Sequence, residues 1–209
     1  MIDRAARVAV PGLLLALLAL VILFARAEMF GSRAAAVPTE PLTSLAVDAL
    51  DGSLLKAGGG LFRSIDRGQS WQPLTLPDDI SPNQIREVVT TASAPDRLYA
   101  AGSGAGIVQS DDRGQTWRTL SDGLPSQEIG AFAVHSSLPD TFYAWIEGQG
   151  VFRTEDSGET WELMDEGPPG DGPPVPMAAL AHSTYEGSMN TGWLYAATPD
   201  GPYLSMDCF

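Results

Sequence analysis

The apolar positions of this sequence fall into two kinds of pattern. Residues Val8 to Ala25 form one unbroken apolar run of 18 residues without a charge. Beyond it, apolar residues come in short runs separated by Gly, Pro, Asp and Ser, which is typical of strands and turns. No helical periodicity is visible outside the first run. The pattern predicts one N-terminal helix followed by an all-β domain.

The first run is long enough for a membrane-spanning helix of about 27 Å. Arg4 and Arg7 precede it on a short tail, which favours a cytoplasmic N-terminus and a periplasmic or extracellular domain. The alternative is a signal peptide, because Ala25-Arg26-Ala27 and Ala34-Ala35-Ala36 fit small-x-small cleavage sites. We expect a cytoplasmic tail at 1–7, a transmembrane anchor in the lipid bilayer at 8–26, a linker at 27–42 and the folded domain at 43–209.

Three similar octets recur in the domain. They read S-I-D-R-G-Q-S-W at 64–71, S-D-D-R-G-Q-T-W at 110–117 and T-E-D-S-G-E-T-W at 154–161. A fourth copy starts near Ser205 but stops after Asp207, without the glycine and tryptophan. The aspartates Asp66, Asp112, Asp156 and Asp207 are 46, 44 and 51 residues apart. Four short apolar runs per unit, at this period, indicate propeller blades. We predict a β-propeller-like domain of about four blades, the last one incomplete.

Each octet position has a structural task in a hairpin turn. The aspartate can accept hydrogen bonds from backbone N–H groups two residues on, and the glycine can adopt a positive φ. Ser or Thr can satisfy further backbone groups, and the tryptophan can bury its ring against the blade. The predicted structural residues are Ser64, Asp66, Gly68, Trp71, Ser110, Asp112, Gly114, Trp117, Thr154, Asp156, Gly158, Trp161, Ser205 and Asp207. The alternative is three copies of a ligand site. Convergence of Asp66, Asp112 and Asp156 on one bound molecule or ion would contradict the interpretation as turns.

The octets resemble the Asp-box, or BNR, repeat of sialidase-like and sortilin-like β-propellers. The sequence around the octets is also similar to that of the propellers of photosystem assembly and stability factors. The resemblance covers about residues 43–209 and implies hairpins on the blade periphery, away from an active site. A sialidase would need several arginines for the substrate carboxylate. Arg63 is the nearest match to that family's initial arginine motif, but Arg153 stands in the same register, so Arg63 belongs to the repeat.

Composition excludes some partners and offers few reactive groups. The formal net charge is −14 and no Lys/Arg cluster occurs, so nucleic acid is not an expected partner. The single cysteine, Cys208, cannot form an intrachain disulfide. We expect His135 and His182 at strand ends rather than on a metal, and the acid pairs Asp78-Asp79 and Asp111-Asp112 in turns. A calcium site in an acidic loop stays open as an alternative. No catalytic, cofactor-binding or metal residue is predicted.

Two features suggest contacts with other molecules. The Pro-rich segment Gly167–Pro176 reads as a stiff loop and a candidate contact. The truncated fourth unit leaves three ways to finish the domain: the segment before the first unit completes a four-bladed ring, another protein adds a strand, or an open arc docks on a larger complex. Tyr143 and Trp145 share a strand face and are expected in the core, with a binding platform as the alternative.

These patterns favour a non-enzymatic function. We expect a membrane-anchored accessory, assembly or stabilising subunit that binds integral subunits of a membrane protein complex. A photosynthetic or respiratory electron-transfer complex is the candidate, on the assembly-factor resemblance alone. The alternative is a glycan-binding or glycoside-hydrolase domain of the sialidase-like type.

Overall fold

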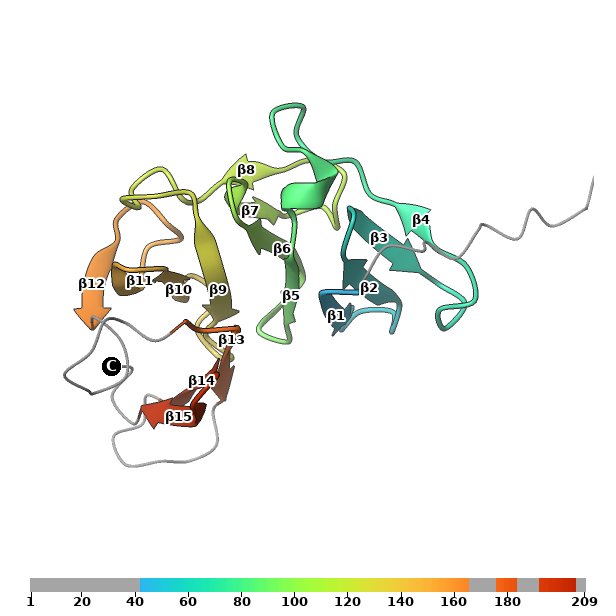
Figure 1. Cartoon of the computed structure of the whole chain (residues 1–209). Helices are drawn as coiled ribbons and strands as arrows, with labels where there is room; N and C mark the ends of the chain where they lie inside the picture. Colours follow the sequence, from blue (N-terminus) through green and yellow to red (C-terminus); the bar gives the residue numbers. More distant parts are fainter. Residues whose placement is uncertain (1–41, 166–175, 184–191, 206–209) are drawn as a thin grey trace, which may run out of the picture. The chain divides into compact units, whose positions relative to one another are not determined.

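The computed structural model describes residues 42–165, 176–183 and 192–205. Within these ranges the chain forms four antiparallel sheets, three with four strands and one with three. Each sheet is a blade, and the blades follow one another in chain order (Figure 1). The innermost strands of successive blades pack against each other, β1 on β5, β5 on β9 and β9 on β13. This confirms the predicted all-β fold with four propeller-like blades.

The blades have the following strands. Blade 1 contains β1 (Ser44–Val47), β2 (Leu54–Ala57), β3 (Leu61–Ser64) and β4 (Gln72–Pro73). Blade 2 contains β5 (Glu87–Thr91), β6 (Ala94–Gly102), β7 (Gly106–Ser110) and β8 (Arg118–Thr119). Blade 3 contains β9 (Ile129–Val134), β10 (Phe142–Ile146), β11 (Gly150–Thr154) and β12 (Glu162–Asp165). The described part of blade 4 contains β13 (Ala179–Ser183), β14 (Trp193–Thr198) and β15 (Gly201–Ser205).

The strand positions follow the short apolar runs closely, with three differences. β6 begins at Ala94, four residues before its apolar run, because Thr91 pairs with Ala94 across a tight turn. β13 begins at Ala179, two residues after the start of the apolar run Met177–Leu180. A short 3-10 helix, η1 (Pro82–Gln84), precedes β5, where a proline at its first position favours a single helical turn.

The core consists of three apolar clusters, one at each junction between neighbouring blades. The cluster between blades 2 and 3 contains Tyr99, Phe132 and Phe142, whose ring centroids lie 5.2–6.0 Å apart. The cluster between blades 3 and 4 contains Tyr143 and Trp145, both almost fully buried. The expectation that these two aromatic residues belong to the core is therefore confirmed. Blades are held together mainly by burial of these faces.

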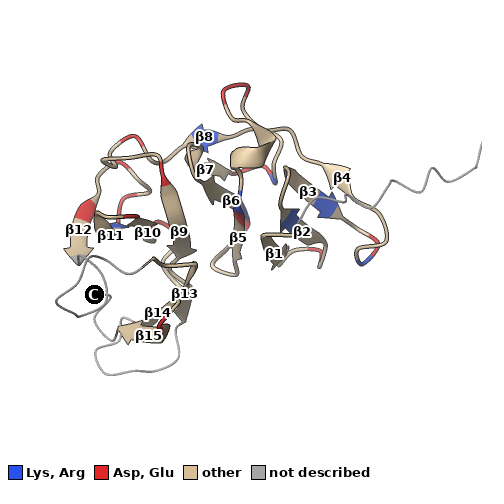
Figure 2. Cartoon of the chain, viewed as in Figure 1, with Lys and Arg blue, Asp and Glu red and all other residues tan. Residues whose placement is uncertain are grey.

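Several predicted features lie outside the described residues. They are the tail at 1–7, the anchor at 8–26, nearly all of the linker at 27–42, most of the Pro-rich segment, Asp207 and Cys208. Among the described residues, no helix has the length and apolar character needed to cross a membrane. Acidic residues are spread over several loops and strands of the described blades rather than gathered on one (Figure 2).

Candidate functional site

The three complete octets form hairpin turns between the third and fourth strands of blades 1, 2 and 3. In the first, Asp66 Oδ1 accepts hydrogen bonds from the backbone N–H of Ser70 (2.8 Å) and from the hydroxyl of Ser64 (2.8 Å). Asp66 Oδ2 accepts from the hydroxyl of Ser70, and Ser64 Oγ accepts from the N–H of Gly68 at 2.7 Å. The aspartate thus reaches a backbone N–H four residues on, not two as expected, because the turn is wider than an Asx turn.

The other two octets repeat these bonds. Asp112 accepts hydrogen bonds from the hydroxyl of Ser110 and from both the hydroxyl and the backbone N–H of Thr116. Asp156 accepts the same bonds from the hydroxyl of Thr154 and from the hydroxyl and backbone N–H of Thr160. In the first two octets, the hydrogen bond from the hydroxyl of Ser70 or Thr116 is the main cause that lowers the pKa of the aspartate to about 2. In the third octet, the hydroxyls of Thr160 and Thr154 lower the pKa of Asp156 to about 2. Each carboxylate is therefore ionised and bonded within its own octet. The three aspartates are not brought together. Ser205 is buried in β15.

The backbone of each octet turns through two left-handed residues. The glycine at the fifth position has φ of +86° in Gly68 and Gly158 and +93° in Gly114, as predicted. The residue before it also has φ near +60°, and it is Arg67, Arg113 or Ser157. A positive φ at a residue with a side chain costs about 1 kcal/mol or more, which the hydrogen bonds of the octet offset.

The octet tryptophans pack between blades rather than against their own blade alone. Trp117 Nε1 donates to the carbonyl oxygen of Thr75 in blade 1 (2.7 Å), and Trp161 Nε1 donates to that of Leu120 in blade 2 (3.0 Å). Both rings also contact the apolar cluster of the preceding junction. No described blade precedes that of Trp71, and its ring lies against the ammonium of Lys56 at 4.7 Å. Two of the three octets therefore fasten one blade to the previous one.

A buried carboxylate of blade 1 joins this blade to the second octet, which belongs to blade 2. Asp48 has a fully buried side chain and pairs with Arg63 of β3 (2.9 Å) and with Arg113 of the second octet (2.7 Å). Asp51 also pairs with Arg113, and this lowers the pKa of Asp51 well below its usual range. This is an interblade ion network, and the expectation that Arg63 belongs to the repeat fits its position.

The described blades leave a pocket of about 330 Å³ where the four innermost strands begin. We call it the axial pocket. Its lining comes from all four blades and consists of Thr43, Ser44, Arg86, Glu87, Ala101, Gly102, Ile129, Gly130, Ala178 and Ala179. Arg86 is exposed and Glu87 is partly buried, and they are the two charged residues of this lining. The sequence prediction missed them, although a glutamate opening an apolar run is an unusual feature.

Glu87 has an unusual protonation equilibrium. Its Oε2 accepts a hydrogen bond from the backbone N–H of Phe132 on the next innermost strand, at 3.0 Å. Burial raises the pKa of Glu87 to about 7, although this hydrogen bond opposes the shift. The carboxyl group is thus poised near neutral pH inside a pocket, which is a common property of functional sites. Such a group can bind a cation, accept a peptide N–H or exchange a proton.

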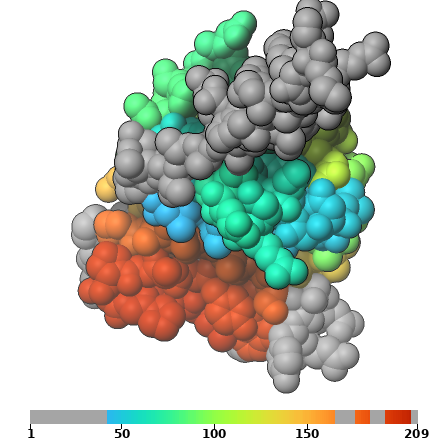
Figure 3. Space-filling view, turned by 90° about the vertical axis from the view of Figure 1, so that its right-hand side faces the viewer, coloured from blue at the N-terminus to red at the C-terminus, as the bar shows by residue number. Residues whose placement is uncertain are grey.

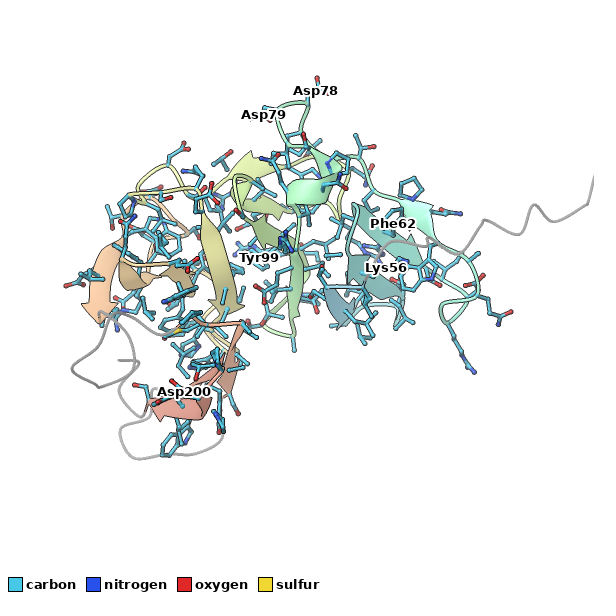
Figure 4. The ribbon with its side chains drawn as sticks, viewed as in Figure 1. Lys56, Phe62, Asp78, Asp79, Tyr99 and Asp200 are labelled. Carbon is cyan, nitrogen blue, oxygen red and sulfur yellow. The ribbon has the colours of Figure 1, made fainter. Side chains whose placement is uncertain are left out.

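Other predicted groups have structural surroundings. Asp111 pairs with Arg97 (3.1 Å) while Asp112 closes its octet, so this acid pair is divided between two contacts. Asp78 and Asp79 are exposed on the loop between β4 and η1 (Figure 4). His135 and His182 lie at or near the ends of β9 and β13, and their rings stack with centroids 3.8 Å apart. Among the described residues, no group of three or more His, Cys, Asp or Glu is placed to hold a metal ion.

Comparison with known proteins supports the fold. A GH74 enzyme from Niastella koreensis superposes with a TM-score of 0.58 and 15% identity, covering 79% of this chain and 28% of that chain. YCF48 from Cyanidioschyzon merolae gives 0.52 and 17%, covering 78% and 52%. YCF48 bound to D1 peptide gives 0.51 and 17%, covering 79% and 49%. Scans against family models and curated proteins found no match.

These similarities show the fold alone, because identities are below 20%. The structural neighbours are β-propellers, and the described residues of this chain form four β-propeller-like blades. The chain spans about half the length of YCF48 and about a quarter of the GH74 enzyme. The neighbours include both an enzyme and a peptide-binding protein, so the fold is compatible with either class.

Proposed function

We propose that the protein is a non-enzymatic, membrane-anchored accessory, assembly or stabilising subunit of a membrane protein complex. In this proposal, residues 8–26 lie in the bilayer, the N-terminus is cytoplasmic and the blades are periplasmic or extracellular. The axial pocket receives a segment of a partner subunit. A photosynthetic or respiratory electron-transfer complex is the candidate partner, by resemblance to photosystem assembly factors.

The axial pocket is the observation that carries this proposal. It offers a polypeptide segment an exposed guanidinium at Arg86, a carboxyl at Glu87 and apolar side chains such as Ile129. Arg86 can pair with a carboxylate, and Glu87 can accept a backbone N–H when it is ionised. Pockets of about 300–1,000 Å³ with a few polar groups are typical of binding sites. The solved YCF48 structure with a D1 peptide gives a propeller neighbour that binds a polypeptide segment.

A glycoside hydrolase is the second candidate, and Glu87 is the observation that favours it. A carboxylic acid with a pKa of about 7 is suited to act as a general acid. Hydrolysis of a glycosidic bond usually needs a second carboxylate, roughly 5–9.5 Å away. The described lining of the axial pocket contains only Glu87 as a carboxylate. We therefore favour binding over hydrolysis.

Copurification from membranes tests this function. The tagged full-length chain is solubilised gently from its native membranes, and the masses of the resulting assemblies are measured by native mass spectrometry. We compare the wild type with Arg86→Glu, and use Arg67→Glu as a control because Arg67 is exposed on an octet hairpin outside the pocket. We expect integral membrane subunits with the wild type and the control, and about tenfold weaker recovery with Arg86→Glu, as the loss of one ion pair of about 1.4 kcal/mol would give.

Two results would contradict the proposal. One is migration of the wild type as a free protein, and the other is equal recovery with Arg86→Glu and Arg67→Glu. Turnover of a glycan panel that includes sialosides, abolished by Glu87→Gln, would instead establish the hydrolase.

A further inference from the structure

Internal blade junctions follow one rule. Each blade has a front face, which contacts the preceding blade, and a back face, which contacts the following blade. The back of blade 1 meets the front of blade 2, and the two later junctions repeat this arrangement. Every internal junction buries an apolar back face against an apolar front face. Among the described residues, no blade covers the front of blade 1 or the back of blade 4.

The front of blade 1 exposes a residue that is buried in every other blade. On the innermost strand, one apolar side chain pairs with the central residue of the second strand: Leu45 with Lys56 in blade 1, and the equivalents with Ala100, Ala144 and Ala196. These equivalents are 0–5% exposed: Val88 3%, Phe132 0% and Leu180 5%. Leu45 is 54% exposed, and Val47 beside it on the same face is 55% exposed.

The back of blade 4 shows the same departure. The second strand carries a large residue on its back face, and this residue is at most 1% exposed in the first three blades: Leu55 0%, Tyr99 0% and Tyr143 1%. The equivalent Tyr195 is 40% exposed, and Leu204, its partner on β15, is 50% exposed. Burial of an apolar side chain of this size stabilises a structure by about 1.5–3 kcal/mol. The back of blade 4 therefore has the composition of a junction, but no blade in the described residues covers it.

Lys56 gives the front of blade 1 a distinct character. It occupies the position of an alanine in the other three blades, yet it is only 7% exposed. Its ammonium lies 5.2 Å from the ring of Phe62 and 4.7 Å from that of Trp71, so aromatic rings cover the charge (Figure 4). The front of blade 1 therefore remains an apolar surface despite its lysine.

We propose that the back of blade 4 in one copy of this chain binds the front of blade 1 in a second copy. The contact between Tyr195 and Leu204 of one copy and Leu45 and Val47 of the other continues the rule of the internal junctions. A two-fold rotation that relates the two copies forms this contact twice and closes the assembly. The two copies then continue the packing of back face on front face from one chain to the other.

The packing of the innermost strands favours a second copy over closure within one chain. Segments of blade 1 (cyan to teal) and of blade 4 (red) both reach the surface seen in Figure 3. However, β1 and β13 make no packing comparable to that of the other neighbouring innermost strands.

Light scattering of the full-length chain in detergent tests this assembly, after subtraction of the detergent mass. One chain has a mass of 22.1 kDa, and we expect twice that for the wild type. Leu45→Asp and Tyr195→Asp each place a charge in the contact, so each variant is expected to shift to the mass of one chain. Leu138→Asp is the control, because Leu138 is also 54% exposed but lies in the turn before β10. We expect this control to keep the two-chain mass.

Mixing the two single variants makes the test specific. Leu45→Asp chains retain an intact Tyr195, and Tyr195→Asp chains retain an intact Leu45, so one unmodified contact forms in the mixed pair. We expect the mixture to recover a two-chain species that neither variant forms alone. A one-chain mass for the wild type would overturn the proposal. So would a two-chain mass that survives either variant, or a mixture that stays at the one-chain mass.

Discussion

Replacement of Glu87 by glutamine tests the environment of the axial pocket. Burial raises the pKa of Glu87 to about 7, above its ordinary value of 4.5. The folded protein therefore binds this proton more tightly than the unfolded chain does. The stabilisation is fully present below about pH 4.5 and is lost as the pH rises through about 7. Glutamine is neutral at every pH, and its oxygen can still accept the hydrogen bond from the N–H of Phe132.

The size of the effect follows from the two pKa values. A rise from 4.5 to about 7 corresponds to about 3 kcal/mol of unfolding free energy lost above pH 7. For a domain of this size, about 1 kcal/mol changes the Tm by about 2–4 °C, so Glu87→Gln should raise the Tm at pH 8 by up to about 10 °C. At pH 5 the glutamate is protonated in the fold, and we expect little difference.

Thermal unfolding followed by circular dichroism at pH 5 and pH 8 measures this difference. Glu147→Gln is the control, since Glu147 is exposed in the turn between β10 and β11; it should leave the Tm nearly unchanged at both pH values. An equal or lower Tm for Glu87→Gln at pH 8 would refute the reasoning, because it would mean that the carboxylate is well solvated or paired in the fold.

Other predictions concern the octets and the blade junctions. Gly158→Ala should cost about 1–3 kcal/mol more than Gly148→Ala in urea unfolding. Both glycines have positive φ, but a Cβ at Gly158 would lie 2.5 Å from the carbonyl oxygen of Leu120, whereas a Cβ at Gly148 would lie in open space. Trp161→Phe should cost about 1 kcal/mol through the lost hydrogen bond to Leu120, and an unchanged urea midpoint would contradict the junction role. Asp112→Ala should lower the Tm at pH 7. The difference in Tm should shrink as the pH falls from about 4 through about 2, because the wild-type carboxylate is then protonated as well. A difference in Tm that is independent of pH would argue against an ionised acceptor.

The hairpins could be predicted because their chemistry is local. Asp156, Gly158 and the two threonines of the third octet lie within seven residues, so the sequence alone shows acceptor, donors and turn residue together. The four-strand blades followed for the same reason, since each consists of short consecutive runs joined by turns. The positive φ of Arg113 was missed because arginine carries no preference for the left-handed region.

Contacts between blades could not be read from the sequence. Trp161 reaches Leu120 across 41 residues, and Asp48 reaches Arg113 across 65. Such pairs depend on how one sheet is rotated against the next, which no local pattern encodes. The axial pocket has the same origin, because Arg86 and Glu87 gain their surroundings only when four innermost strands begin at one place.

Photo-crosslinking from residue 86 tests the central claim, that the axial pocket binds a segment of a membrane-complex subunit. A photoreactive amino acid replaces Arg86 in the full-length chain in native membranes, and the same amino acid at the exposed residue Arg67 serves as the reference. Our account predicts an adduct with an integral membrane subunit from position 86 that is absent or much weaker from position 67. No adduct from position 86, or the same adduct from both positions, would contradict it.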